Sequence, residues 1–353
     1  MLTATLLAGV VLAGCRSSSS RPAEPSDEST GIAPTTSVLA EDSTRALQRD
    51  FELMASTGAH WVRFDFDWSG AEPKPGSFDW RLIDRLVRAA RAQHLGILAT
   101  VAYTPAWARP EGTTDKAPPT DPAAFANFAR AAASRYAPLG VHHWELWNEP
   151  NVTAFWEPAP NPTAYAALLK ASAGAVRSAD PAATIISAGL APGVDRSDGA
   201  TVSPRTFLRG VYDAGGGPAF DAVGIHPYSY PDPPLTPGPD NTFFTLPDTY
   251  QVMVDHGDGA KRIWGTEFGA PTGSSERAVT GDQQADRLRE GYDQWRRWSF
   301  TGPLFWYSHR DKGTDQSDPE DNFGLVTNIG HPKPTLAALR AVTLPARQPR
   351  PRP

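Results

Sequence analysis

The stretch VHHWELWNEPN, residues 141–151, decides our expectation for the fold. Its first part is apolar and aromatic at the spacing typical of a buried β-strand. The stretch then ends in an amide, a carboxylate and a proline at Asn148, Glu149 and Pro150. A parallel barrel places such polar side chains at the carboxyl ends of its strands, where the loops carry function. We therefore interpret this stretch as one strand of a barrel.

The remainder of the chain repeats the pattern of a short apolar run followed by an amphipathic helical segment. Strict alternation of this kind favours βα units around a parallel sheet, and eight units close a (β/α)8 barrel. The sequence predicts strands near 31–38, 60–66, 96–103, 142–148, 184–189, 220–226, 261–267 and 303–308, and helices near 43–57, Leu82–Ala90, Phe125–Ala132, 162–178, 203–213, 247–256, 281–298 and 332–341.

Length and composition agree with one such barrel and short tails. The chain has 353 residues, 40% of them hydrophobic, which is enough for a large core. The net charge of −6 gives no reason to expect nucleic acid as a partner. Eleven tryptophans offer flat faces that stack on sugar rings, but tryptophan also fills cores, so composition alone assigns no function.

The N-terminal segment predicts export. Residues 2–14 form an apolar run that is too short to span a membrane and is typical of a signal peptide. The run ends in LAGC, which resembles the bacterial lipobox, so we expect Cys15 to be lipidated and to anchor the protein on the outer side of the cell membrane. The alternative is an ordinary secretory signal. The segment departs from the usual pattern because no basic residue precedes the apolar run, and a truncated start would explain this departure.

These features divide the chain into four parts. We expect a signal peptide with a lipobox over 1–15, a disordered Ser/Pro-rich tether over 16–30, the catalytic barrel over 31–345 and a disordered tail over 346–353. With its one cysteine in the expected anchor, the barrel has no cysteine for an internal disulfide.

Two glutamates at strand ends indicate the chemistry. Glu149 follows the fourth predicted strand and Glu267 ends the seventh, so their side chains converge above the barrel. Two carboxyl groups on either side of one bond are what glycoside hydrolysis requires, and a separation of ~5–5.5 Å makes one of them a nucleophile. Salt bridges across the barrel mouth are the alternative interpretation.

The motifs resemble clan A of the glycoside hydrolases. WNEPN at 147–151, HPY at 226–228 and TEFG at 266–269 carry the resemblance across the whole barrel. WNEPN and WVRFDFDW at 61–68 look most like family 39, which includes bacterial exopolysaccharide endoglycosidases and β-xylosidases, with cellulase-like family 5 second. The resemblance implies that Glu149 is the acid/base, that Glu267 is the nucleophile, that the stereochemistry is retained, and that Asn148 binds the sugar 2-hydroxyl.

Further residues are expected to bind the substrate or support the site. Arg63 lies inside an apolar strand and needs a partner, for which Glu267 is the candidate. His226 is either a core histidine or a site residue, and the resemblance implies that Tyr228 bonds the nucleophile. The resemblance also makes Trp306 a platform for the sugar, and Tyr103 and Trp107 are loop aromatics that either line flanking subsites or pack on the surface.

The sequence predicts neither a cofactor nor a metal. The acidic segment 311–324 lacks the spacing of an EF-hand, and the pair at 142–143 has no zinc-ligand partners. We expect a polysaccharide of the cell envelope or the surroundings as substrate and no obligatory protein partner. Endo action is favoured over exo action. The same residues would also serve a transglycosylase, and a barrel that binds carbohydrate without catalysis is the non-enzymatic interpretation.

Overall fold

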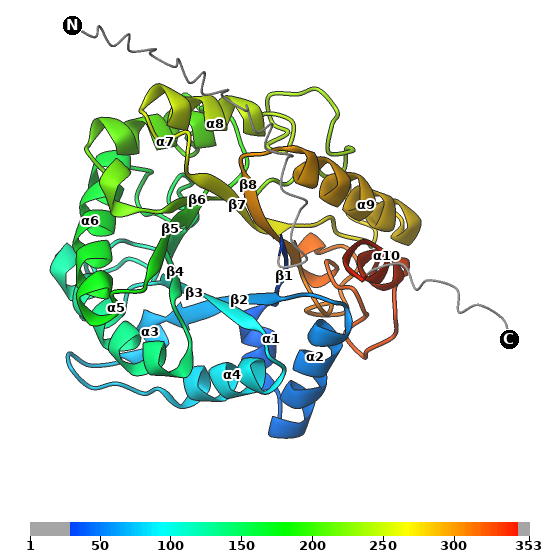
Figure 1. The fold of residues 1–353 in the computed structure, drawn as a ribbon, viewed down its shortest axis with the longest axis horizontal. Coiled ribbons are helices and arrows are strands. Elements are labelled where there is room, and N and C mark those ends of the chain that lie inside the picture. The colour runs from blue at the N-terminus through cyan, green and yellow to red at the C-terminus, as the bar shows by residue number, and fades with distance from the viewer. Residues whose placement is uncertain (1–28, 345–353) are drawn as a thin grey trace, which may run out of the picture.

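The computed structural model describes residues 29–344, and these form one closed barrel of eight parallel strands in chain order (Figure 1). The predicted (β/α)8 fold is confirmed. The expected lipidation site, Cys15, and nearly all of the expected tether and tail lie outside the described residues. The strands are β1 (Thr30–Ala33), β2 (Trp61–Asp67), β3 (Gly96–Ala102), β4 (His143–Asn148), β5 (Thr184–Gly189), β6 (Ala222–Ile225), β7 (Arg262–Phe268) and β8 (Thr301–Tyr307).

Helices surround the barrel on the outside (Figure 1). The eight predicted helices are present, and two short ones that the sequence analysis missed, α1 and α3, follow β1 and β2. None of the described helices is both long and apolar enough to span a bilayer. The helices are α1 (Thr36–Glu41), α2 (Thr44–Ser56), α3 (Trp68–Ala71), α4 (Arg81–Ala92), α5 (Pro122–Tyr136), α6 (Pro162–Ala179), α7 (Pro204–Asp213), α8 (Leu246–Asp255), α9 (Gly281–Arg297) and α10 (Pro334–Thr343).

Local signals explain where several helices begin. Proline starts α5, α6 and α7, and the side chains of Asp121, Asn161 and Ser203 accept hydrogen bonds from the first free backbone N–H groups. Proline suits this position because its missing N–H would have no helical partner. These caps set where each loop at the mouth of the barrel ends.

Two apolar layers hold the barrel. The larger lies between the strands and the helices, where α2 buries the predicted Leu47, Phe51 and Met54. The smaller fills the barrel interior. A Cβ built on Gly31 would lie only 2.3 Å from the Phe305 ring, so a side chain at this position would clash with the ring. The interior layer contains Ala33, Leu98, Ile186, Ala222, Trp264 and Phe305. The polar side chains above this layer therefore stand on a rigid floor.

Candidate active site

Glu149 directly follows β4 and is held by an unusual backbone. Its φ is 49°, in the left-handed region, and its N–H donates to the Gly189 carbonyl at the end of β5, with an N–O distance of 2.9 Å. Non-glycine residues rarely adopt this conformation, and such residues cluster at functional sites. The side chain is 14% exposed, so the carboxylate stands at the edge of the solvent.

Glu267 ends β7 within a set of donors. Arg63 Nη1 lies 2.6 Å from one carboxylate oxygen and the Tyr228 hydroxyl lies 2.8 Å from the other. Burial alone would raise the pKa of Glu267. The positive charges of His226 and Arg63 and these hydrogen bonds outweigh it and hold the pKa below the usual range. A carboxylate kept ionised in this way suits a nucleophile.

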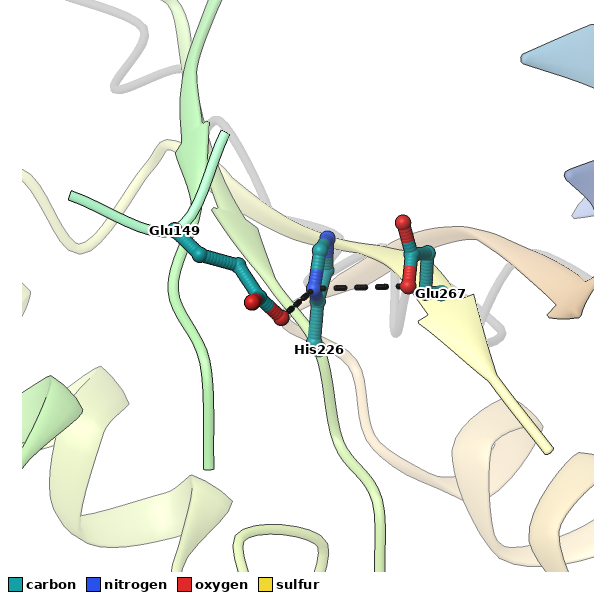
Figure 2. A group of neighbouring side chains, drawn as sticks. All are labelled: Glu149, His226 and Glu267. Atoms are coloured by element: carbon teal, nitrogen blue, oxygen red, sulfur yellow. Dashed lines mark hydrogen bonds and ion pairs between the residues drawn. The ribbon is translucent and has the colours of Figure 1, made fainter. Parts of the chain in front are cut away.

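Figure 2 shows His226 between the two glutamates. His226 Nδ1 lies 2.6 Å from Glu149 Oε1 and 3.6 Å from Glu267 Oε2. One ligand atom from each of the three side chains lies within 4.8 Å of the others, so the two carboxylates are close together. The His226 side chain is fully buried. Burial opposes its protonation, but the charge of Glu267 and the hydrogen bond to Glu149 raise its pKa overall.

Arg63 organises the floor of the site. Besides Glu267 it binds Glu145 through Nε at 2.6 Å and Asn148 Oδ1 through Nη2 at 2.7 Å. Glu145 is wholly buried, and its other oxygen accepts from the Gly189 N–H at 3.0 Å. The predicted pairing of Arg63 with Glu267 is present, whereas the sequence analysis missed Glu145. An acidic residue inside the strand WELWN was the signal that could have found it.

A cavity of about 900 Å³ opens above these groups. Both glutamates line it, and so do four of the residues expected to bind substrate: Arg63, Tyr103, Asn148 and Tyr228. The His226 side chain contacts Glu149 and has no exposed surface. Because it is fully buried, it does not reach a substrate, contrary to its expected binding role.

Two expected aromatic residues lie outside the cavity. Trp306 is fully buried and packs edge-on against Phe268, so it has no face on which a sugar can stack. Trp107 lines a separate surface pocket, and its indole N–H donates to the Glu72 carbonyl at 2.8 Å. The neighbouring Tyr307 lines the cavity instead. The sequence analysis therefore chose the wrong residue of β8.

Carboxylates outnumber cations around the cavity. Of the acidic residues, Asp67 caps α3 through bonds to the N–H groups of Ser69 and Gly70. Burial raises the pKa of Asp65 to about 6; Arg63 opposes this, and the negative charges of Asp67 and Glu267 add to it. The acidic lining residues are Asp65, Asp67, Asp115, Glu149, Glu267 and Glu320, against Arg63, Lys116 and Lys312.

Two smaller cavities flank the central one. The first, about 460 Å³, shares Asp65, Asp67 and Leu82 with it on the side of β2. The second, about 350 Å³, shares Pro192, Tyr228 and Tyr230 with it beside the loop after β6. Strands β2 and β6 stand on opposite sides of the barrel (Figure 1). The three cavities therefore cross the mouth of the barrel.

Among the described residues, one group of side chains is close enough together to hold a metal ion. Glu149, His226 and Glu267 form the one group of carboxylate and imidazole atoms close enough to hold an ion there, and an ion would have to displace the 2.6 Å hydrogen bond between His226 and Glu149. In the acidic segment 311–324, Asp315 and Asp318 accept hydrogen bonds from nearby backbone N–H groups. These carboxylates are used to form turns.

The comparisons with known proteins show similarity to glycoside hydrolases. A family model described as beta-galactosidase of glycoside hydrolase family 42 matches residues 40–143, and that match ends before Glu149. The chain is 27% identical to a family 39 glycoside hydrolase from Bacteroides cellulosilyticus, with a TM-score of 0.72. The match covers 90% of this chain and 64% of the other. It therefore spans less than two thirds of that relative.

Two further structures share the fold. A monomeric beta-xylosidase from Caulobacter crescentus has 21% identity and a TM-score of 0.67, with 92% of this chain and 70% of the other covered. A GH5_18 structure from Streptomyces cattleya in complex with GlcNAc has 15% identity and a TM-score of 0.64, with 92% and 82% covered. No curated protein matches the chain by sequence.

The fold is that of solved glycoside hydrolases of families 39 and 5, and the resemblance predicted from the sequence is confirmed. Solved structures of families 39 and 5 are among those similar to the chain, and these are the two families that the sequence analysis named from WNEPN and WVRFDFDW. These comparisons support a glycosidase.

Proposed function

We propose that the protein is a retaining glycoside hydrolase that cleaves an extracellular or cell-envelope polysaccharide from within the chain. The observation that carries the proposal is the pair of carboxylates in one cavity, with oxygens of Glu149 and Glu267 within 4.8 Å. Retaining enzymes place their carboxyl groups ~5–5.5 Å apart, whereas inverting enzymes need ~6.5–9.5 Å to admit water.

The two carboxylates take different roles. Glu267, held ionised by Arg63 and Tyr228, attacks the anomeric carbon. Glu149 protonates the leaving oxygen, so the glycosidic bond breaks as the bond to Glu267 forms. Glu149 then takes a proton from water, and the resulting hydroxide displaces Glu267 and restores the original configuration.

Asn148 is suited to hold the sugar beside the nucleophile. Its Oδ1 accepts a hydrogen bond from Arg63 Nη2 at 2.7 Å. This bond fixes the amide with its N–H₂ group turned away from Arg63. A donor in this place matches the expected contact with the sugar 2-hydroxyl, a contact that strengthens in the transition state.

The flanking cavities support endo action. A polymer lying across the mouth of the barrel would place sugar units in the cavity near Leu82 and in the cavity near Tyr230 at the same time. An exo enzyme needs one end of its site closed. The Pro-rich loop 227–247 is the segment that would close it, but this loop borders a cavity of about 350 Å³. Exo action remains the alternative, and product analysis distinguishes the two modes.

We further propose that a lipid on Cys15 anchors the enzyme at the outer face of the membrane. The LAGC motif and the polar segment 16–30 support this arrangement. A tether suits an enzyme whose polymeric substrate cannot enter the cell. Metabolic labelling with a lipid analogue would test the proposal, with Cys15→Ala as the unlabelled control.

The test of the proposed activity is product analysis on a polysaccharide panel. Residues 29–344 and their Glu267→Gln variant are incubated with each polymer, and we expect short oligosaccharides from the native protein alone. Monosaccharides alone would indicate exo action, and products extended by an added acceptor sugar would indicate transglycosylation. Binding without cleavage by either protein would instead identify a carbohydrate-binding barrel.

A further inference from the structure

Two buried polar atoms beneath the site lack a hydrogen bond among the described residues. Neither His226 Nε2 nor Thr266 Oγ1 has a partner among residues 29–344, and both side chains are fully buried. A buried polar group without a partner has lost its hydrogen bonds to water and gained none in return, which is destabilising. Two such atoms directly below the catalytic glutamates call for an explanation.

The two atoms border the same small space at the end of β5. A Cβ built on Gly189 would lie 2.2 Å from His226 Nε2 and 2.5 Å from Thr266 Oγ1. Any side chain at this position would therefore push into the imidazole and the hydroxyl. The absence of a side chain at Gly189 allows His226 and Thr266 to approach each other.

The other ring nitrogen of His226 is already committed. Nδ1 lies 2.6 Å from Glu149 Oε1, so a proton on Nδ1 is shared with the acid/base. When that proton passes to Glu149, the neutral ring must keep its remaining proton on Nε2. Nε2 then needs an acceptor in the charged and in the neutral ring alike. Thr266 Oγ1 is the hydroxyl that borders it.

We propose that Thr266 is a positioning residue that accepts the Nε2–H of His226 and so makes the Nδ1 proton the one that His226 supplies to Glu149. In the first step, the Nδ1 proton moves to Glu149 Oε1 as Glu149 gives its proton to the leaving oxygen. In the second step, water returns a proton to Glu149, and the Nδ1–H bond re-forms. The inference rests on the proposed function, because it deepens the role of Glu149.

The surrounding charges are compatible with this exchange. Glu149 faces His226 from the end of β4, Glu267 from β7 and Arg63 from β2. The pair of His226 and Glu149 gives one proton to the leaving oxygen in the first step and regains one from water in the second, so its total charge is restored at the end of each turnover. The raised pKa of His226 agrees with a ring that holds a proton between turnovers.

The test uses Thr266→Val, with Thr266→Ser as the variant that keeps the hydroxyl and Thr242→Val as the matched control. Thr242 is also buried with an unpaired hydroxyl among the described residues, but it lies on the loop before α8 and lines none of the three cavities at the mouth of the barrel. For each variant, kcat/KM is measured across pH on two aryl glycosides of the sugar that the native enzyme cleaves. One carries a poor leaving group and the other a dinitrophenol, which leaves without an acid.

We expect Thr266→Val to lower kcat/KM about tenfold for the poor leaving group and to leave it unchanged for the dinitrophenyl glycoside. The alkaline limb of the profile should move about one pH unit lower, because the charged ring loses its acceptor. Thr266→Ser should restore both values, and Thr242→Val should resemble the native enzyme.

An equal loss of kcat/KM on both glycosides would overturn the inference, because a purely structural defect slows them alike. Native behaviour of Thr266→Val would overturn it as well. Neither result touches the proposed function, which fails only if the native protein cleaves no glycoside.

Discussion

Two histidines at opposite ends of the barrel have pKa values shifted in opposite directions. His143 begins β4 and packs between aromatic rings, with centroid distances of 4.6 Å to Trp61 and 5.7 Å to Trp264. Burial, aided by the charge of His142, lowers its pKa to about 4. At the mouth of the barrel, the negative charge of Glu267 and the bond to Glu149 overcome burial and raise the pKa of His226.

The difference shows that the two ends of one barrel give similar imidazole rings different surroundings. The end where β4 begins surrounds a titratable ring with apolar groups and keeps it neutral, which serves packing. The end where β4 stops surrounds a similar ring with carboxylates and raises its pKa, which suits the proposed role of His226 beside Glu149. The predictions below test this division, from the largest expected effect to the smallest.

Arg63→Met should have the largest effect, because it removes the cation that pairs with both Glu145 and Glu267. The variant leaves Glu145 wholly buried without its charged partner and leaves Glu267 with the Tyr228 hydroxyl but without the Arg63 donor. Breaking a buried pair by removing one partner costs about 3–5 kcal/mol of the free energy of unfolding. We expect that loss in urea unfolding, together with a fall in kcat of about 10³-fold.

The double variant Arg63→Met with Glu145→Gln separates the two effects. It removes the unpaired buried charge, so it should recover much of the stability while its activity stays low. Recovery of activity in the double variant would contradict the role of Arg63 at Glu267.

Substituting the two histidines in turn tests the comparison directly. His226→Gln should lower kcat/KM about 10²-fold because the acid/base loses its ionisable partner, whereas His143→Phe should leave kcat/KM unchanged. Equal losses in both variants would break the proposed division of the barrel.

The pH dependence of stability should also differ. The folded pKa of His143, about 4, lies below its unfolded value of about 6.5, so protonation of the unfolded chain reduces native stability as pH falls below about 6.5. His143→Phe should remove this loss, giving the variant its largest gain in unfolding temperature near pH 4 and little gain at pH 8. A constant difference between these pH values would contradict the lowered pKa.

Asp65→Asn should have the smallest effect. The folded pKa of Asp65 is about 6, above its unfolded value of about 3.9, so the folded state binds the proton more tightly and native stability falls as pH rises between these values. Because Asp65 is partly exposed, we expect a gain of only about 2 °C in unfolding temperature at pH 7.5 and none at pH 3.5. A gain of equal size at both pH values would show that the charge is not its cause.

Much of the fold was predictable because each βα unit carries its own signal. The α6 and α9 helices lie within one residue of their predicted bounds, since caps and hydrophobic periodicity mark them locally. The short α1 helix was missed because its six residues contain too few turns to show a period. The predicted first strand ran to residue 38, whereas β1 ends at Ala33.

Residues of the site could be predicted only where a sequence motif identifies them. Glu149 and Glu267 were found from WNEPN and TEFG, but which residue of β8 faces the cavity depends on three-dimensional register. The pairing of β7 with β8 shifts twice between Ile263 and Phe268, and both faces of a barrel strand are buried, so alternation does not distinguish Trp306 from Tyr307. Glu145 was missed because its partner, Arg63, lies on another strand.

The left-handed backbone of Glu149 has a consequence for the history of the protein. With φ at 49°, the glutamate holds a conformation that glycine adopts more readily, and relief of such strain stabilises by about 1 kcal/mol. A lineage freed from the need for this reaction would gain stability by exchanging the glutamate for glycine. Under the proposed function, the carboxylate that Glu149 contributes to the reaction offsets this loss of stability.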